Sequence, residues 1–93
     1  MIKIALLGCG RIGKMHAATV VRAPNAELAV VYDPVDAAAQ EVARQFGCAV
    51  AAGAEEAIAA SDAVLIATST PTHADLIEAA AKAGKAIFCE KPI

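Results

Sequence analysis

Two kinds of hydrophobic pattern alternate along this chain. Five short, mostly apolar runs are typical of strands buried inside a parallel sheet: Lys3–Leu7, Glu27–Tyr32, Cys48–Ala51, Ala63–Ala67 and Ala86–Cys89. Between these runs, apolar residues recur every three or four positions, which indicates helices with one buried face. The stretches with that spacing are Arg11–Ala23, Val35–Phe46, Ala54–Ala60 and Thr72–Ala83. The chain therefore alternates strand and helix throughout.

The start of the fourth helix has two interpretations. Thr70 can cap the helix with Pro71 at its first helical position, because proline is tolerated there. Alternatively, Thr72 can cap the helix, with Asp75 three residues later. Both interpretations place the boundary within two residues.

Strand–helix alternation with short links predicts right-handed crossovers and a parallel sheet covered by helices on both faces. We expect a doubly wound α/β fold with the spatial strand order 3-2-1-4-5. Gly47 is predicted to end the second helix in the left-handed conformation, and Gly84 is predicted to end the fourth helix. Residues 1–93 are expected to form one domain, which ends before a sixth strand.

Composition narrows the class of protein. The 93 residues carry a formal net charge of −2, and no basic patch favours nucleic acid or anionic lipid as a partner. No apolar run approaches the ~20 residues that cross a membrane. Cys9, Cys48 and Cys89 are odd in number and form no C-x-x-C pair, and neither histidine lies at metal-ligand spacing from them. We therefore expect a cytoplasmic protein with three buried thiols and no metal.

A glycine motif follows the first predicted strand. Residues 8–13 read GCGRIG, which is the pattern G-x-G-x-x-G between a strand and a helix. Gly8 would allow a tight turn, Gly10 would let a pyrophosphate approach the backbone, and Gly13 would let the helix lie close to the sheet. The amide groups near Arg11 and Ile12 would bind the diphosphate at the positive end of the helix dipole. The alternative is an ordinary glycine-rich turn.

Asp33 follows the second strand, twenty residues beyond Gly13. A dinucleotide-binding Rossmann unit has an acidic residue at about this distance, which accepts hydrogen bonds from the adenosine ribose hydroxyls. A carboxylate also repels a 2′-phosphate, and residues 34–39 contain no arginine or lysine that would neutralise one. The sequence therefore predicts NAD rather than NADP. Asp33 could also start the next helix, and the two roles are compatible.

Three segments carry a resemblance to a known family. Residues 8–17 read GCGRIGKMHA, residues 70–73 read TPTH, and residues 83–92 read AGKAIFCEKP. In this order and spacing they resemble the glucose-fructose oxidoreductase / inositol dehydrogenase family of nicotinamide-dependent sugar and polyol dehydrogenases. The resemblance covers the whole chain, and E-K-P after a buried strand is its most specific part.

The resemblance implies roles for residues beyond the glycine turn. Residues expected to lie near the nicotinamide half of the coenzyme are Thr68, Ser69, Thr70, Glu90 and Lys91. Lys91 would be catalytic, because a lysine beside the reacting hydroxyl stabilises developing alkoxide charge. His73 would either contact the coenzyme or belong to the helix end. His16 is expected to pack beneath the glycine loop.

The resemblance also implies that this chain is a fragment. Family members are more than three times as long, and a C-terminal domain binds the sugar or polyol, supplies the general base and builds a homo-oligomer. The 93 residues alone would then bind NAD without turning over an inositol-like alcohol. Two other functions stay open: a non-catalytic module that senses NAD(H), and the first half of a Rossmann reductase of imines or aldehydes.

Overall fold

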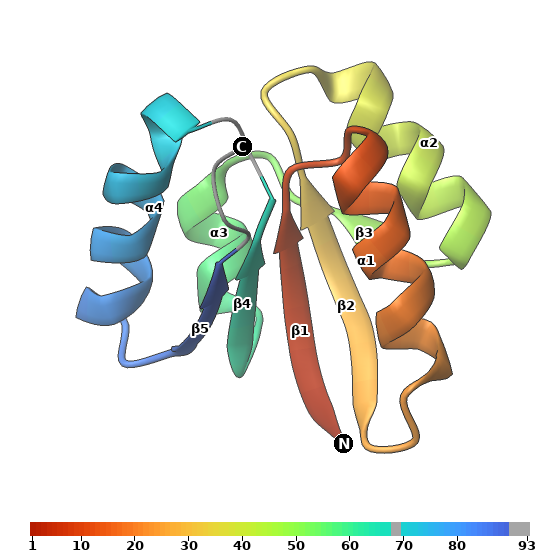
Figure 1. The fold of residues 1–93 in the computed structure, drawn as a ribbon, viewed down its shortest axis with the longest axis horizontal. Helices are drawn as coiled ribbons and strands as arrows, with labels where there is room; N and C mark the ends of the chain where they lie inside the picture. Colours follow the sequence, from red (N-terminus) through yellow and green to blue (C-terminus); the bar gives the residue numbers. More distant parts are fainter. Residues whose placement is uncertain (68–69, 90–93) are drawn as a thin grey trace.

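The protein is described by a computed structural model, which places the backbone of residues 1–67 and 70–89 and the side chains of residues 1–67 and 75–88. Five strands alternate with four helices (Figure 1). The strands are β1 (Ile2–Leu7), β2 (Ala26–Tyr32), β3 (Ala49–Val50), β4 (Ala63–Ile66) and β5 (Ala86–Cys89). The helices are α1 (Arg11–Arg22), α2 (Asp36–Phe46), α3 (Ala54–Ala59) and α4 (Thr70–Lys82).

All the strand pairs are parallel, and the order across the sheet is β3-β2-β1-β4-β5. The predicted strand order is therefore confirmed. Tyr32, Leu7, Ile66 and Cys89 form one row of neighbours at the carboxyl ends of four strands. The loops that follow these strands consequently leave the sheet at the same edge.

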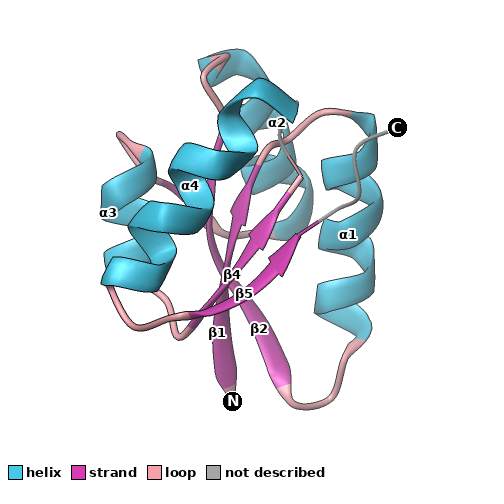
Figure 2. Cartoon of the chain, turned by 60° about the vertical axis from the view of Figure 1, so that its left-hand side comes forward, coloured by secondary structure: helices cyan, strands magenta, loops and turns pink. Residues whose placement is uncertain are grey.

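Helices cover the sheet in two layers (Figures 1 and 2). Helices α1 and α2 lie on one face, over β1 and β2, whereas α3 and α4 lie on the other face. Each face has its own apolar cluster. Side chains of β1 alternate between the two clusters, because successive residues of a strand point to opposite faces. Leu6 packs towards α1 and α2, and Leu7 packs towards α3 and α4.

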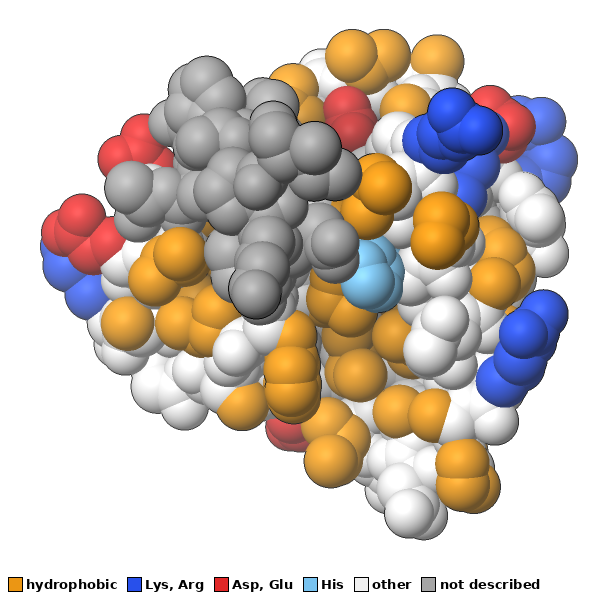
Figure 3. Space-filling model, viewed as in Figure 1, with side chains coloured by type: hydrophobic (Ala, Val, Ile, Leu, Met, Phe, Trp, Pro, Cys, Tyr) orange, Lys and Arg blue, Asp and Glu red, His pale blue; other side chains and the backbone are white. Residues whose placement is uncertain are grey.

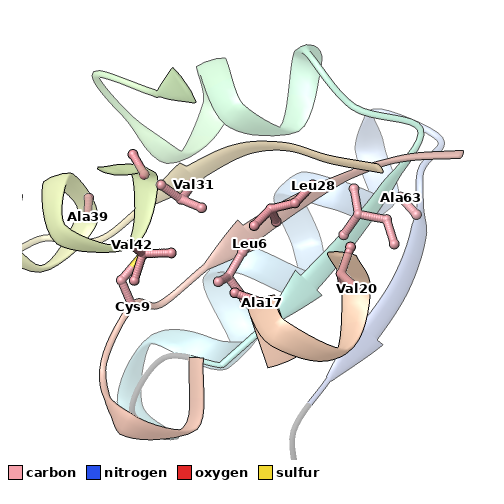
Figure 4. Packing of buried hydrophobic residues seen from close by; sticks show 11 residues of the cluster. Leu6, Cys9, Ala17, Val20, Leu28, Val31, Ala39, Val42 and Ala63 are labelled. Atoms are coloured by element: carbon pink, nitrogen blue, oxygen red, sulfur yellow. The ribbon is translucent and has the colours of Figure 1, made fainter. Parts of the chain in front are cut away.

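The cluster beneath α1 and α2 extends along the whole height of the sheet. Figure 4 shows Cys9 beside Val42 at one end of this cluster, and Val20 near the other end. Small residues such as Ala17 and Ala39 are almost fully buried there. Their lack of bulk lets the two helices pack close to the strands, which agrees with the alanine-rich sequence.

Element boundaries differ from the predictions by one or two residues. Strand β3 has two residues instead of four, because the amide of Cys48 bonds back to Ala43 at the end of α2. Helix α4 begins at Thr70, so Thr70 is helical rather than a cap, and Thr72 lies inside the helix. Gly47 ends α2 with φ 70°, in the predicted left-handed conformation.

Candidate dinucleotide-binding site

The turn between β1 and α1 depends on a glycine at its first position. Gly8 has φ 112°, a backbone conformation that side chains disfavour. This conformation turns the chain sharply at the end of β1. The amide of Gly8 donates a hydrogen bond to the carbonyl of Tyr32, with a distance of 2.8 Å. The predicted role of Gly8 in a tight turn is therefore supported by its geometry.

Gly13 and Gly10 differ in what surrounds them. A Cβ on Gly13 would overlap the carbonyl oxygen of Gly8 and lie 2.8 Å from its carbonyl carbon. Helix α1 therefore approaches the turn as closely as a glycine allows. A Cβ on Gly10, by contrast, would meet no atom within 4 Å. Glycine at position 10 leaves an open space above the turn, which is where a ligand would approach the backbone.

The start of α1 has no side-chain cap among the described residues. Its N-cap is Gly10, which provides no side-chain cap, and the first turn contains no acidic residue. The first N–H groups of a helix have no partner within the helix, and they carry the positive end of its dipole. The amides near Arg11 and Ile12 therefore form a suitable site for a phosphate group. Arg11 itself is exposed.

Asp33 links the glycine turn to the following turn. Its Oδ2 accepts a hydrogen bond from the amide of Cys9 at 2.7 Å, and its Oδ1 accepts one from the amide of Val35 at 2.8 Å. The residue is half-buried. A carboxylate has about four acceptor sites, so two backbone bonds leave capacity for ribose hydroxyls. The turn predicted to bind phosphate and the carboxylate predicted to bind ribose thus lie next to each other.

The Cys9 side chain lies under the glycine turn. It is 1% exposed, and its thiol lies 3.7 Å from the carbonyl oxygen of Tyr32. Burial, followed by the nearby charge of Asp33, raises the pKa of Cys9 to about 12. Burial also raises the pKa of Cys48. Cys9 is buried as predicted, but Cys48 is only half-buried, because it follows the exposed end of α2. The Cys89 side chain lies outside the described residues.

The other predicted site residues belong to segments that follow β4 and β5. Thr68, Ser69, Glu90 and Lys91 lie outside the described residues. Thr70 and His73 occupy the first turn of α4, where the backbone alone is described. Strand β4 ends beside Leu7 and strand β5 ends beside Ile66 of β4, so both end at the edge that carries the glycine turn. His16 is half-buried on α1.

Sequence patterns did not indicate the hydrogen bond from Cys9 to Asp33. The donor is a backbone amide, which every residue except proline carries, so its position cannot be deduced from residue type. The ion pair between Lys14 of α1 and Glu41 of α2, with Nζ and Oε1 2.8 Å apart, was also not predicted. It joins the two helices that flank the site, and Lys14 lowers the pKa of Glu41 by hydrogen bond and charge.

One hollow on the described surface lies away from the glycine turn. Its volume is about 440 Å³, and it lies between α3 and α4, where Glu55, Asp75 and Glu78 line part of it. It is on the opposite side of the sheet from α1. Among the described residues, no cluster of three histidine, cysteine or acidic side chains could bind a metal. No described helix is long and apolar enough to span a membrane.

Comparisons with known proteins agree with this geometry. The inositol 2-dehydrogenase of Rhizobium meliloti is 55% identical over 93 residues, which are 99% of this chain and 28% of that protein. The scyllo-inositol 2-dehydrogenase (NAD(+)) of Bacillus subtilis is 41% identical, with the same coverage of 99% and 28%. A crystal structure of a myo-inositol dehydrogenase from Corynebacterium glutamicum superimposes with a TM-score of 0.91 at 41% identity, over 100% of this chain and 28% of that one.

This chain thus spans 28% of the length of each of these relatives. The family model that matches residues 2–93 describes an oxidoreductase family with an NAD-binding Rossmann fold. That match covers every element of the sheet and the glycine turn. The chain therefore belongs to the GFO/IDH/MocA oxidoreductase family, with the NAD-binding Rossmann fold.

Proposed function

We propose that this chain binds NAD for an oxidoreductase that oxidises a secondary alcohol of an inositol-like polyol or sugar. The observation that carries the proposal is the hydrogen bond between the amide of Cys9 and Asp33, 2.7 Å long. It holds a carboxylate near Gly10, where a Cβ would meet no atom within 4 Å. A dinucleotide needs these two features together, one for the diphosphate and one for the adenosine ribose.

The proposal favours NAD over NADP. Asp33 is a fixed negative charge, and a 2′-phosphate placed against it would be repelled. Residues 34–39 offer no positive side chain that would offset this repulsion. A 2′-hydroxyl, in contrast, can donate a hydrogen bond to the free acceptor sites of the carboxylate. Among the relatives, the Bacillus subtilis protein is described as using NAD(+).

The proposed reaction assigns roles to the chain's own residues. NAD, when bound, accepts the hydride that leaves the alcohol carbon. The glycine turn would hold the diphosphate and Asp33 the adenosine ribose, while Thr68, Ser69, Thr70, His73 and Glu90 would border the nicotinamide half. Lys91 would stabilise the alcohol oxygen as its proton leaves. The substrate and these later roles rest on the sequence motifs and on the relatives.

Calorimetric titration of the chain with NAD⁺ and with NADP⁺ tests the coenzyme part of this proposal. We expect NAD⁺ to bind more tightly. Replacing Asp33 by asparagine should weaken NAD⁺ binding by about tenfold to a hundredfold, because a hydrogen bond to a charged group is lost. The same change should weaken NADP⁺ binding less, since it also removes repulsion. Tighter binding of NADP⁺ by the unmodified chain, or no binding of either coenzyme, would refute the proposal.

A further inference from the structure

The glycine turn is attached to the end of β2 through consecutive residues. The amide of Gly8 donates to the carbonyl of Tyr32 at 2.8 Å, and the amide of Cys9 donates to Asp33 at 2.7 Å. The Cys9 thiol lies 3.7 Å from the same Tyr32 carbonyl oxygen. These contacts join the part of the site that faces the diphosphate to the part that faces the ribose.

The side chain of Cys9 determines how closely these two parts can approach. It is 1% exposed and belongs to the cluster beneath α1 and α2. Val42 of α2 and Val31 of β2 belong to the same cluster, and both are fully buried. Figure 4 shows the Cys9 side chain directed towards Val42. Because the Cys9 side chain is almost fully enclosed, we expect a larger side chain at position 9 to raise the turn or displace α2.

Raising the turn would break a specific contact. Among the described residues, two backbone amides donate to the Asp33 carboxylate, those of Cys9 and Val35. If Cys9 moves outwards, the bond from Val35 is the one of these two that remains. Its carboxylate can then rotate away from the position where it accepts ribose hydroxyls. The residue at position 9 would thus act on coenzyme binding through Asp33.

We propose that Cys9 is a positioning residue of the coenzyme site, whose small buried side chain keeps Asp33 in place and so sets the preference for a 2′-hydroxyl over a 2′-phosphate. This inference rests on the proposed function. Cys9 touches no part of the coenzyme in this scheme. Its thiol is protonated at neutral pH, so packing and its amide, rather than thiolate chemistry, produce the effect.

The test compares NAD⁺ and NADP⁺ binding to four forms of the chain by calorimetry. Cys9→Leu adds two heavy atoms at the turn, and we expect it to lower the ratio of NAD⁺ to NADP⁺ affinity by about tenfold, the effect of one lost charged hydrogen bond. Cys9→Ala removes bulk and should keep the ratio within about threefold. The matched control is Ala63→Val, which adds two heavy atoms in the same cluster, at the start of β4.

A second measurement separates positioning from loss of structure. Cys9→Leu is combined with Asp33→Asn. The change in NAD⁺ affinity that the leucine causes in the Asp33→Asn background is compared with the change that it causes in the unmodified chain. If Cys9 acts through Asp33, the leucine should have little further effect once the carboxylate is gone. Circular dichroism reports whether each variant is folded. If the leucine variant is unfolded, Cys9→Val, which adds one heavy atom, replaces it in the cycle.

The outcomes distinguish this inference from the function on which it rests. An unmodified chain that binds neither coenzyme would contradict both. An unmodified chain that prefers NAD⁺, together with a folded Cys9→Leu variant of unchanged preference, would overturn the positioning role alone. The positioning role would also be overturned if Cys9→Leu lowered NAD⁺ affinity by the same factor with and without the Asp33 carboxylate.

Discussion

At the scale of single residues, the three glycines of the turn have different physical tasks. Gly8 has a positive φ, Gly13 lies against the Gly8 carbonyl, and Gly10 borders open space. The backbone at Gly10 has φ −76°, which residues with side chains adopt readily. Gly13 is therefore required by the folded chain itself. The described residues around Gly10 would accept a Cβ, and we propose that a ligand approaching the turn makes glycine necessary there.

This difference predicts opposite behaviour for two alanine variants. Gly13→Ala should destabilise the fold by about 1–3 kcal/mol through steric overlap, although glycine-to-alanine changes in open helix interiors gain about 1 kcal/mol. Gly10→Ala should leave stability nearly unchanged but lower NAD⁺ affinity by about tenfold or more, because its methyl group would occupy the space of the diphosphate. Thermal unfolding and calorimetry measure the two effects. A stable Gly13→Ala variant would contradict the close contact between α1 and the turn.

Much of this turn could be predicted from residue types, and part of it could not. Glycine spacing reports a steric requirement, and Asp33 is a side chain, so both leave a signal in the sequence. The bond between Asp33 and the amide of Cys9 leaves none, because a backbone donor is common to nearly all residues. The role of Cys9 thus becomes visible only when the fold brings positions 9 and 33 together.

At the scale of elements, strand and helix types were predicted correctly, but some ends were not. Buried parallel strands and amphipathic helices have distinct periods, which explains the success. Helix and strand ends depend on local hydrogen bonds. The amide of Val35 bonds to Asp33 and keeps Val35 extended, so α2 begins at Asp36. A side-chain hydrogen bond of this kind to an amide at the start of a helix is not apparent from periodicity.

The ion pair between α1 and α2 provides a prediction at this scale. Because Lys14 lowers the pKa of Glu41 from 4.5, the pair stabilises the fold above that pH, and its contribution should disappear as the pH falls through the lowered pKa. Both side chains are substantially exposed, at 39% and 58%, so salt should weaken the pair. A double-mutant cycle of Lys14→Gln and Glu41→Gln, measured by thermal unfolding, should give a small coupling at pH 7 and a smaller one at pH 3. Equal coupling at both pH values would contradict the predicted pH dependence of this ion pair.

At the scale of the whole molecule, one face of the sheet is covered unevenly. Helices α1 and α2 lie over β1 and β2, and no described helix lies on that face of β4 and β5 (Figures 1 and 2). Phe88 pairs in register with Leu65, so both point to this face, and Phe88 is 58% exposed. Figure 3 shows hydrophobic side chains across the middle of the molecule, between its two helix layers. Parallel sheets are normally covered on both faces, so this surface favours association.

The free edge of β5 also favours association between chains. Within the described residues, β5 pairs with β4 alone, so its other edge presents backbone donors and acceptors. Unpaired edges of this kind bind other strands, and an adjacent apolar patch adds to the driving force. We therefore predict that the 93-residue chain self-associates through β5. Sedimentation should show an average mass that rises with concentration above the 9.4 kDa of one chain.

Phe88→Lys tests whether this face is responsible. Removing a buried phenylalanine from an interface loses about 1.5–3 kcal/mol, so self-association should weaken by about tenfold or more. Ile77→Lys is the matched control, because it adds the same charge at a residue of α4 that is 37% exposed on the other face. If both variants dissociate alike, net charge rather than the β5 face controls association. A wild-type chain that sediments as a monomer at every concentration would show that the exposed edge and Phe88 are insufficient to drive pairing.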